Sequence, residues 1–221
     1  MFDTLLLLAG ELERPFLAEM LTRLNPGLDI VGVDTQEALS SLLPGALARA
    51  RLIGFATPLV VPAHSLKGIG HGAYNFHPGP PEYRGWHPHC FAVYDGAKTF
   101  GVTAHVMSER VDSGAIVGVE RFAVPEGSDA EGLGEIVYGA LLGLFSRLAP
   151  ALATDPRPLP TLAEAWSGRA TTRRDFAAMC ELSNDMPEEE VQRRLRAFGS
   201  GDGFSRPVPA QAAGMTGAPT M

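Results

Sequence analysis

Apolar positions fall in short runs through the first two-thirds of the chain, and stretches with helical spacing separate these runs. Short, continuously apolar runs are typical of buried strands in a parallel sheet. The first three lie at residues 4–9, 28–33 and 52–56. Residues 15–24 and 36–43 have helical spacing, and Thr35 can cap the second of these helices. The β-α-β-α-β order favours a mostly parallel sheet with helices on both faces.

The next hundred residues continue the pattern with three more strands and two helices. We predict strands at residues 73–77, 100–107 and 115–124. Pro88 suits the first turn of a helix that reaches about residue 94. Ser128 and Glu131 have the spacing of a capping box and begin a long apolar helix that we expect to end near Pro150. The predicted fold class is α/β, with a Rossmann-like sheet and a short C-terminal helical appendage.

The end of the chain differs in composition, so we divide the chain into residues 1–153 and residues 154–221. Residues 154–160 are proline-rich and are expected to be a linker. Residues 186–198 predict a helix, because acids lie in its first turn and arginines in its last. From residue 199 onward glycine, proline and alanine dominate, and we expect little regular structure.

Composition and charge exclude several classes of protein. Hydrophobic residues make up 45% of the 221 residues, which is enough for a sizeable core and too much for general disorder. The formal charge of −7 argues against broad binding of nucleic acid. No apolar run approaches the ~18 residues of a membrane span, and Asp3 makes the apolar N-terminus a better candidate for a strand than for a signal peptide. We expect a cytoplasmic protein without membrane association.

The two cysteines and the nearby histidines raise the question of a metal site. Cys90 and Cys180 lie far apart in sequence and suit reduced thiols. The segment HPHC (87–90), taken with His77, has zinc-binding residue types. However, Pro88 should begin a helix directly after His87, and no second pair of ligands has suitable spacing. We therefore assign no metal site.

The segment YNFHPGPPEYRG (74–85) places polar residues at the end of a predicted strand. Because successive side chains of a strand face opposite ways, Tyr74 and Phe76 share one face and Asn75 and His77 share the other. The prolines that follow cannot donate ladder hydrogen bonds, so they end the strand. We expect the aromatic pair to be buried and the amide and imidazole to project together.

A second polar signal lies in the segment GVTAHVMSERVDSGAIV (101–117). Its first part alternates as a strand, with Thr103, His105 and Met107 on one face. Asp112 follows in a polar stretch, with Gly114 just after it. An aspartate in such a place commonly caps or forms a turn, and Asp112 taken alone fits that role.

The ordered combination of these segments resembles the 10-formyltetrahydrofolate-dependent formyltransferase family. The similarity is strong over about residues 52–124 and weak before them. It rests on the segments NFHPG (75–79), YRG (83–85), DGAKTFGVTAHVM (95–107) and VDSGAIV (111–117). This resemblance implies an enzyme that uses 10-formyltetrahydrofolate as its co-substrate and needs no metal.

By this resemblance the catalytic residues of the family fall on Asn75, His77 and Asp112. The formyl group on the folate nitrogen is an activated amide, so an amine can attack it directly. Asn75 and a protonated His77 can donate hydrogen bonds to the oxyanion that forms. Asp112 is then expected to keep His77 charged and to accept a proton from the attacking amine, directly or through water.

The resemblance also implies a folate pocket beside these residues. The loop after the histidine supplies Gly79, Pro80 and Pro81, and an apolar loop supplies Leu59, Val60 and Val61. For the apolar loop, ordinary core packing is an equally good interpretation. The loop between His77 and the Arg-Gly pair is one residue shorter than the common form, which alters the expected contacts.

The acceptor is inferred by comparing branches of the family. The segment AGELERPF (9–16) lacks the phosphate-binding glycine loop of the purine-biosynthesis branch and has no GxGxxG fingerprint. The length is short for the C-terminal barrel of the initiator-tRNA branch. We expect a small-molecule amine such as an amino sugar and no nucleic-acid partner, and we allow for a homodimer. The alternatives are a 10-formyltetrahydrofolate hydrolase, a methionyl-tRNA formyltransferase-like enzyme and, less favoured by the intact residues, a non-catalytic folate-binding module.

Overall fold

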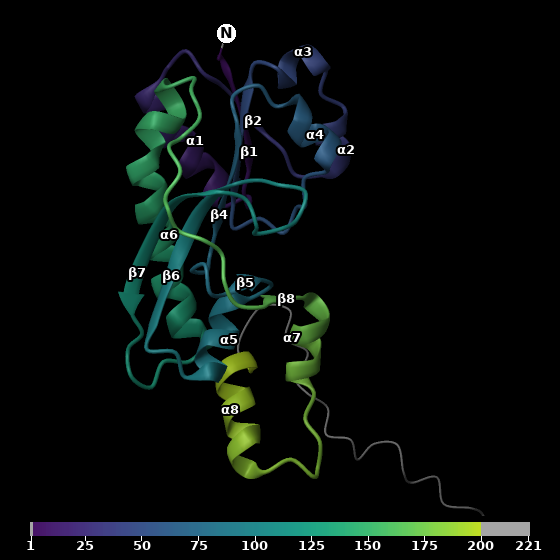
Figure 1. Cartoon of the computed structure of the whole chain (residues 1–221), viewed down its shortest axis with the longest axis vertical. Helices are drawn as coiled ribbons and strands as arrows, with labels where there is room; N and C mark the ends of the chain where they lie inside the picture. The colour runs from purple at the N-terminus through teal and green to yellow at the C-terminus, as the bar shows by residue number, and fades with distance from the viewer. Residues whose placement is uncertain (1, 200–221) are drawn as a thin grey trace, which may run out of the picture.

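A computed structural model describes residues 2–199 and contains one six-stranded sheet, in the order β2-β1-β3-β4-β6-β7 (Figure 1). The first four strands in this order run parallel, and the last two pair antiparallel. The strands are β1 (Thr4–Leu8), β2 (Asp29–Gly32), β3 (Ala50–Phe55), β4 (Ala73–His77), β6 (Thr99–Val106) and β7 (Ile116–Ala123). The predicted α/β class with a mostly parallel sheet is therefore confirmed. The predicted irregular tail lies, from residue 200 onward, outside the described residues.

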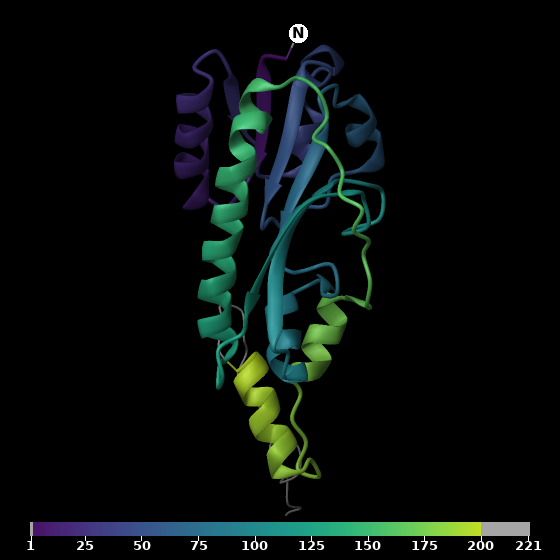
Figure 2. The same ribbon diagram turned by 60° about the vertical axis from the view of Figure 1, so that its left-hand side comes forward.

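Helices cover both faces of this sheet (Figures 1 and 2). One face carries α1 (Glu13–Leu24) and α6 (Ala130–Thr154), and the other carries α2 (Gln36–Ser40), α3 (Pro44–Leu47) and α4 (Ala63–Gly68). Strand β1 is buried throughout, and its side chains alternate between the two cores. Leu5 and Leu7 face α1 and α6, whereas Leu6 and Leu8 face the other helices. The expectation of a buried first strand is confirmed.

The rest of the chain packs at the lower end of the molecule in Figure 1. There α5 (Pro88–Asp95) contacts α8 (Glu188–Phe198), and Phe198 packs against Phe91 and Phe176. A two-stranded sheet joins β5 (Arg84–Gly85) to β8 (Ala170–Thr171). Helix α7 (Arg173–Cys180) was not predicted, although Thr172 and Asp175 form a capping box, which is a sequence signal for the start of a helix.

Helix α6 departs from prediction at both ends. Its cap is Asp129, whose side chain accepts the Gly132 N–H at 2.9 Å, while the Ser128 hydroxyl donates to the Pro125 carbonyl. The helix runs through Pro150 to Thr154, because buried apolar residues on either side of the proline hold the helix against the core.

Helix α6 also corrects our statement about apolar runs. By length and composition it is long and apolar enough to cross a membrane. Nine of its residues are buried inside the protein, so α6 has the burial of a core helix. They are Ala130, Leu133, Val137, Leu141, Leu144, Phe145, Ala149, Leu152 and Ala153.

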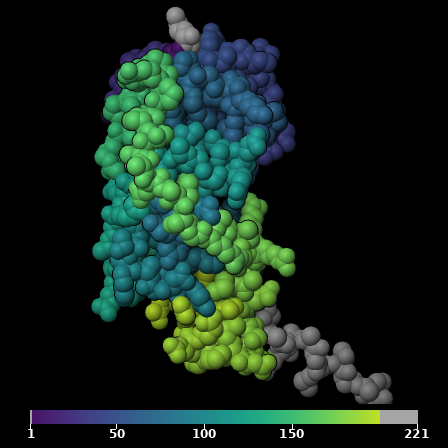
Figure 3. All heavy atoms as spheres, viewed as in Figure 1, coloured from purple at the N-terminus to yellow at the C-terminus, as the bar shows by residue number. Residues whose placement is uncertain are grey.

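Residues 155–169, which we call the strap, lie along the sheet rather than apart from it. Figures 1 and 2 show the strap leaving the end of α6 and running back to β8, and Figure 3 shows its green atoms on the surface. Its backbone N–H groups bond to the sheet domain: Leu159 donates to the Tyr74 hydroxyl at 2.8 Å, and Leu162 donates to the Ile116 carbonyl at 2.7 Å. The predicted linker over residues 154–160 is therefore a packed segment.

Arg51 fastens the beginning of the strap to the sheet. This β3 residue is fully buried, and its guanidinium donates to four backbone carbonyls at 2.7–3.1 Å. The carbonyls belong to His71, Ala151, Leu152 and Arg157, so one side chain joins the loop before β4, the last turn of α6 and the strap.

We expect Arg51→Met to lower the free energy of unfolding by about 3 kcal/mol or more, because buried carbonyls lose a charged donor. Arg49→Met is the matched control, since Arg49 is 56% exposed and lies 3.5 Å from Asp3. A surface change of that kind should stay within about 0.5 kcal/mol. Urea unfolding followed by circular dichroism measures both; equal effects would show that the buried contacts of Arg51 contribute little.

Candidate active site

The site begins where β4 and β6 pair. Tyr74 and Phe76 are buried in the core beneath α6, while Asn75 and His77 face the other side of the sheet, as the alternation predicts. The antiparallel register sets Asn75 opposite His105 and His77 opposite Thr103. Two neighbouring strands thus present an amide and two imidazoles on one face.

Asp112 completes this cluster from the loop between β6 and β7. Its backbone is left-handed, with φ of +47°, and its side chain is buried. One carboxylate oxygen, Oδ2, lies 3.4 Å from Nδ1 of His77 and accepts the Gly85 N–H at 2.9 Å. The other, Oδ1, lies 3.3 Å from Nε2 of His105. The structure therefore brings Asn75, His77 and Asp112 together, with His105 as a fourth member.

The hydrogen-bond partners limit where protons can reside. Nε2 of His77 donates to the Tyr83 carbonyl at 2.9 Å, and Nδ1 of His105 donates to the Val106 carbonyl at 2.9 Å. Nε2 of His105 lies 3.3 Å from both the Asn75 amide nitrogen and the Asp112 carboxylate. An unprotonated Nε2 can accept a hydrogen bond from the Asn75 amide, whereas a protonated Nε2 can donate one to the Asp112 carboxylate. The two hydrogen bonds are therefore alternatives.

The pKa directions differ from the expectation for His77. Burial lowers the pKa of His77 below its ordinary 6.5, although the Asp112 charge and the Tyr83 carbonyl act in the opposite sense. Burial also opposes ionisation of Asp112, but His77, His105 and the Gly85 N–H together lower the pKa of Asp112 to about 2. Burial therefore favours a neutral His77 beside an ionised Asp112 at neutral pH, which goes against our expectation of a resting imidazolium.

A cavity of about 670 Å³ opens beside this cluster, which is within the usual range for small-molecule sites. Its lining includes all three predicted catalytic residues and His105. The apolar loop contributes Leu59, Val60 and Val61 to the same lining. Among the described residues, Gly79, Pro80 and Pro81 are buried and are not part of this lining.

Two neighbours of this cluster were not singled out in the sequence. His105 lies on the predicted strand, but only the pairing of that strand with β4 brings it to Asn75. Trp166 comes from the strap, and its ring centroid lies 5.9 Å from that of His77 and 5.0 Å from that of His105. Nothing local in the sequence indicates that contact.

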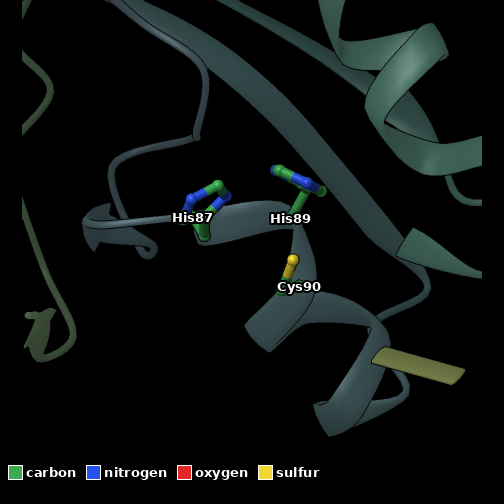
Figure 4. Close-up of side chains that lie close together, drawn as sticks. All are labelled: His87, His89 and Cys90. Atoms are coloured by element: carbon green, nitrogen blue, oxygen red, sulfur yellow. The ribbon is translucent and has the colours of Figure 1, made fainter. Parts of the chain in front are cut away.

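The first turn of α5 gathers three potential metal ligands (Figure 4). The ligand atoms of His87, His89 and Cys90 all lie within 4.8 Å of one another, and this group has three members within residues 2–199. Burial lowers the pKa of His89 to about 4 and raises the pKa of the Cys90 thiol to about 12. The His87 ring stacks on Phe176 at 4.5 Å. These are packing contacts, so we keep the prediction that no metal binds here.

Comparison with known protein families finds a match for the segment that contains the site. Residues 52–138 match the family model described as formyl transferase. This segment is therefore similar to a formyl transferase domain. The resemblance inferred from the motifs is confirmed, and the matched segment contains Asn75, His77 and Asp112.

Two curated relatives give the range of the match. Methionyl-tRNA formyltransferase of Listeria welshimeri is 30% identical over 125 residues, which cover 56% of this chain and 37% of the relative. A dTDP-4-amino-4,6-dideoxyglucose formyltransferase of Mycobacterium bovis is 36% identical over 88 residues, which cover 39% of this chain and 35% of the relative. The match thus spans little more than a third of each relative.

The fold extends the similarity over nearly the whole chain. A sugar N-formyltransferase from a Shewanella species superposes with a TM-score of 0.76. The match covers 97% of this chain and 95% of that one at 18% identity. The two proteins therefore share their fold.

We predict that the purified protein holds no stoichiometric zinc and that replacing both Cys90 and Cys180 with alanine leaves activity and metal content unchanged. The reason is that the group at the start of α5 offers three ligands from one turn of a helix, one of which, His87, stacks on Phe176, whereas structural zinc sites hold four ligands. Elemental analysis by plasma mass spectrometry checks this. One zinc per chain that disappears in the double variant would contradict it.

Proposed function

We propose that this protein transfers a formyl group from 10-formyltetrahydrofolate to the amine of a small-molecule acceptor such as an amino sugar. One observation carries the proposal. Asn75, His77 and Asp112 meet at the wall of a 670 Å³ cavity, inside the segment that matches the formyl transferase family. Asp112 contacts His77 and His105, and Asn75 in turn contacts His105, so the residues form one connected cluster at this wall.

The apolar loop supports a pocket for the folate ring. Val60 is 52% exposed and lines the cavity, so it offers apolar surface that a planar ring could cover. Val61 is 7% exposed and belongs to the core around Leu6 and Leu8, so for this residue packing is the larger role. In this proposal Gly79, Pro80 and Pro81 shape the loop that ends β4 and lie behind the wall.

The reaction needs a donor for the developing oxyanion and a place for one proton. The folate substrate supplies the formyl carbonyl, and the amine is the nucleophile. The Asn75 amide lies in the cavity wall and can donate to that oxygen. Nε2–H of His77 donates to the same oxygen by exchanging the Tyr83 carbonyl for it.

The proton released by the attacking amine passes to the pair formed by His77 and Asp112. Nδ1 of the neutral ring is free to accept a proton, and the ionised carboxylate 3.4 Å away stabilises the resulting charge. Asp112 thus acts when His77 becomes charged during the reaction, rather than by keeping it charged at rest. The tetrahedral intermediate then collapses: the bond from the formyl carbon to N10 of the folate breaks, and the proton held by the pair passes to N10, which leaves as tetrahydrofolate. Folate and acceptor together provide every atom that is exchanged.

The acceptor is inferred from relatives with the same fold. A Helicobacter canadensis N-formyltransferase, with a TM-score of 0.66, was solved with folinic acid and dTDP-3-aminofucose. The net charge of −7 disfavours tRNA relative to a small amine. A 10-formyltetrahydrofolate hydrolase is the second candidate, because water can replace the amine at the same residues.

The test is to incubate the protein with 10-formyltetrahydrofolate, with and without a panel of amino sugars and amino-sugar nucleotides. Tetrahydrofolate release and formylated product are followed by mass spectrometry. Amine-dependent release with formation of a formamide supports the transferase. Rapid release without any amine supports the hydrolase, and failure to bind or turn over folate under all conditions contradicts both.

We expect Asp112→Asn to lower kcat by several orders of magnitude while folate affinity is kept, because asparagine fits the turn but cannot balance a charged His77. Asp95→Asn is the matched control, since it removes one exposed carboxylate that accepts a hydrogen bond from the Tyr83 hydroxyl and is not part of the cluster. A variant that retains more than about a tenth of wild-type kcat, a barrier change of roughly 1.4 kcal/mol or less, would contradict the assignment.

A further inference from the structure

The strap places an indole directly against the two imidazoles of the site. Trp166 meets the His77 ring at an interplanar angle of 67° and the His105 ring at 87°, both edge-to-face arrangements. Aromatic pairs in this geometry attract each other beyond the area they bury. One side chain from residues 155–169 therefore contacts both rings that flank Asp112.

Trp166 covers these rings from a side other than the cavity. It is not among the residues that line the cavity, whereas His77, His105 and Asp112 all are. These three residues are nevertheless only 2–4% exposed. Other side chains must therefore shield these residues from solvent on the side away from the cavity. The Trp166 indole, which lies against both imidazole rings, is one of them.

The position of the indole is fixed by bonds to the site itself. Nε1 of Trp166 donates to the Gly114 carbonyl at 2.7 Å, two residues after Asp112. The next residue, Ser167, donates its N–H to the Pro81 carbonyl at 3.0 Å. The carbonyl of Gly168 accepts from Arg84 at 2.8 Å. The strap is thus bonded to both loops that carry the cluster.

We infer that Trp166 is a positioning residue, which holds the His77 and His105 rings against Asp112 and keeps water from this side of the cluster. The catalytic part of this inference rests on the function proposed above. The placement of the rings does not, because it can be measured in the free protein. Among the described residues, the titratable groups that face His77 are Asp112 and His105.

The expected effect on His77 follows from burial. Burial is the largest influence on the pKa of His77 and lowers it. Water admitted by Trp166→Ala should therefore raise that pKa toward its ordinary value. Trp166→Phe keeps an aromatic ring against the imidazoles and should change the pKa less.

The experiment compares Trp166→Ala, Trp166→Phe and the control Leu162→Ala in the full chain. Leu162 is a 45% exposed strap residue that bonds to the sheet through its backbone N–H. Imidazole signals are titrated by nitrogen-15 NMR without substrate, and kcat and KM for 10-formyltetrahydrofolate are measured separately. We expect the alanine variant to titrate at higher pH and to lose about 10- to 100-fold in kcat with KM nearly unchanged.

An unchanged His77 titration in Trp166→Ala would overturn the inference, as would an equal change in Leu162→Ala. A shifted titration in a protein with no formyltransferase activity would support the positioning role while rejecting the proposed function. If Trp166→Ala does not fold, Trp166→Leu is titrated instead, with circular dichroism as the check of folding. For that variant too, an unchanged His77 titration, or an equal change in Leu162→Ala, would overturn the inference.

Discussion

A buried carboxylate beside two imidazoles is the constraint on which the rest of the site depends. Asp112 is 4% exposed, and burial of its charge is unfavourable unless polar groups surround it. His77, His105 and the Gly85 N–H are those groups. Each is delivered by a different part of the fold, so β4, β6 and β5 must all be in place before the carboxylate can be buried.

The C-terminal part of the chain supports this arrangement from a distance. Gly85 donates to Asp112 from β5, and β5 is held by pairing with β8. The Thr171 hydroxyl lies within hydrogen-bond distance of the Arg84 and Trp86 carbonyls on either side of Gly85, at 3.0 and 2.9 Å. Segments far apart in sequence therefore act on one carboxylate.

Local sequence patterns predicted the strands and the side chains that β4 contributes to the site. The positions of His105 and Trp166 depend on contacts between residues distant in sequence. The alternation around Asn75 and His77 needs only one strand, and the structure confirms it. His105 joins them through antiparallel register between strands about thirty residues apart, which periodicity does not specify. Trp166 depends on the path of an irregular segment, which bonds between residues distant in sequence determine.

The most direct test of this account is the ionisation of Asp112 itself. The carboxyl carbon can be followed by carbon-13 NMR from neutral pH into acid, with Asp112→Asn used to assign its signal. The contacts to two imidazoles and an amide predict a midpoint near 2, well below the ordinary 3.8. A midpoint at or above 3.8 would show that burial outweighs those contacts, and it would contradict the central claim that an ionised Asp112 organises the site.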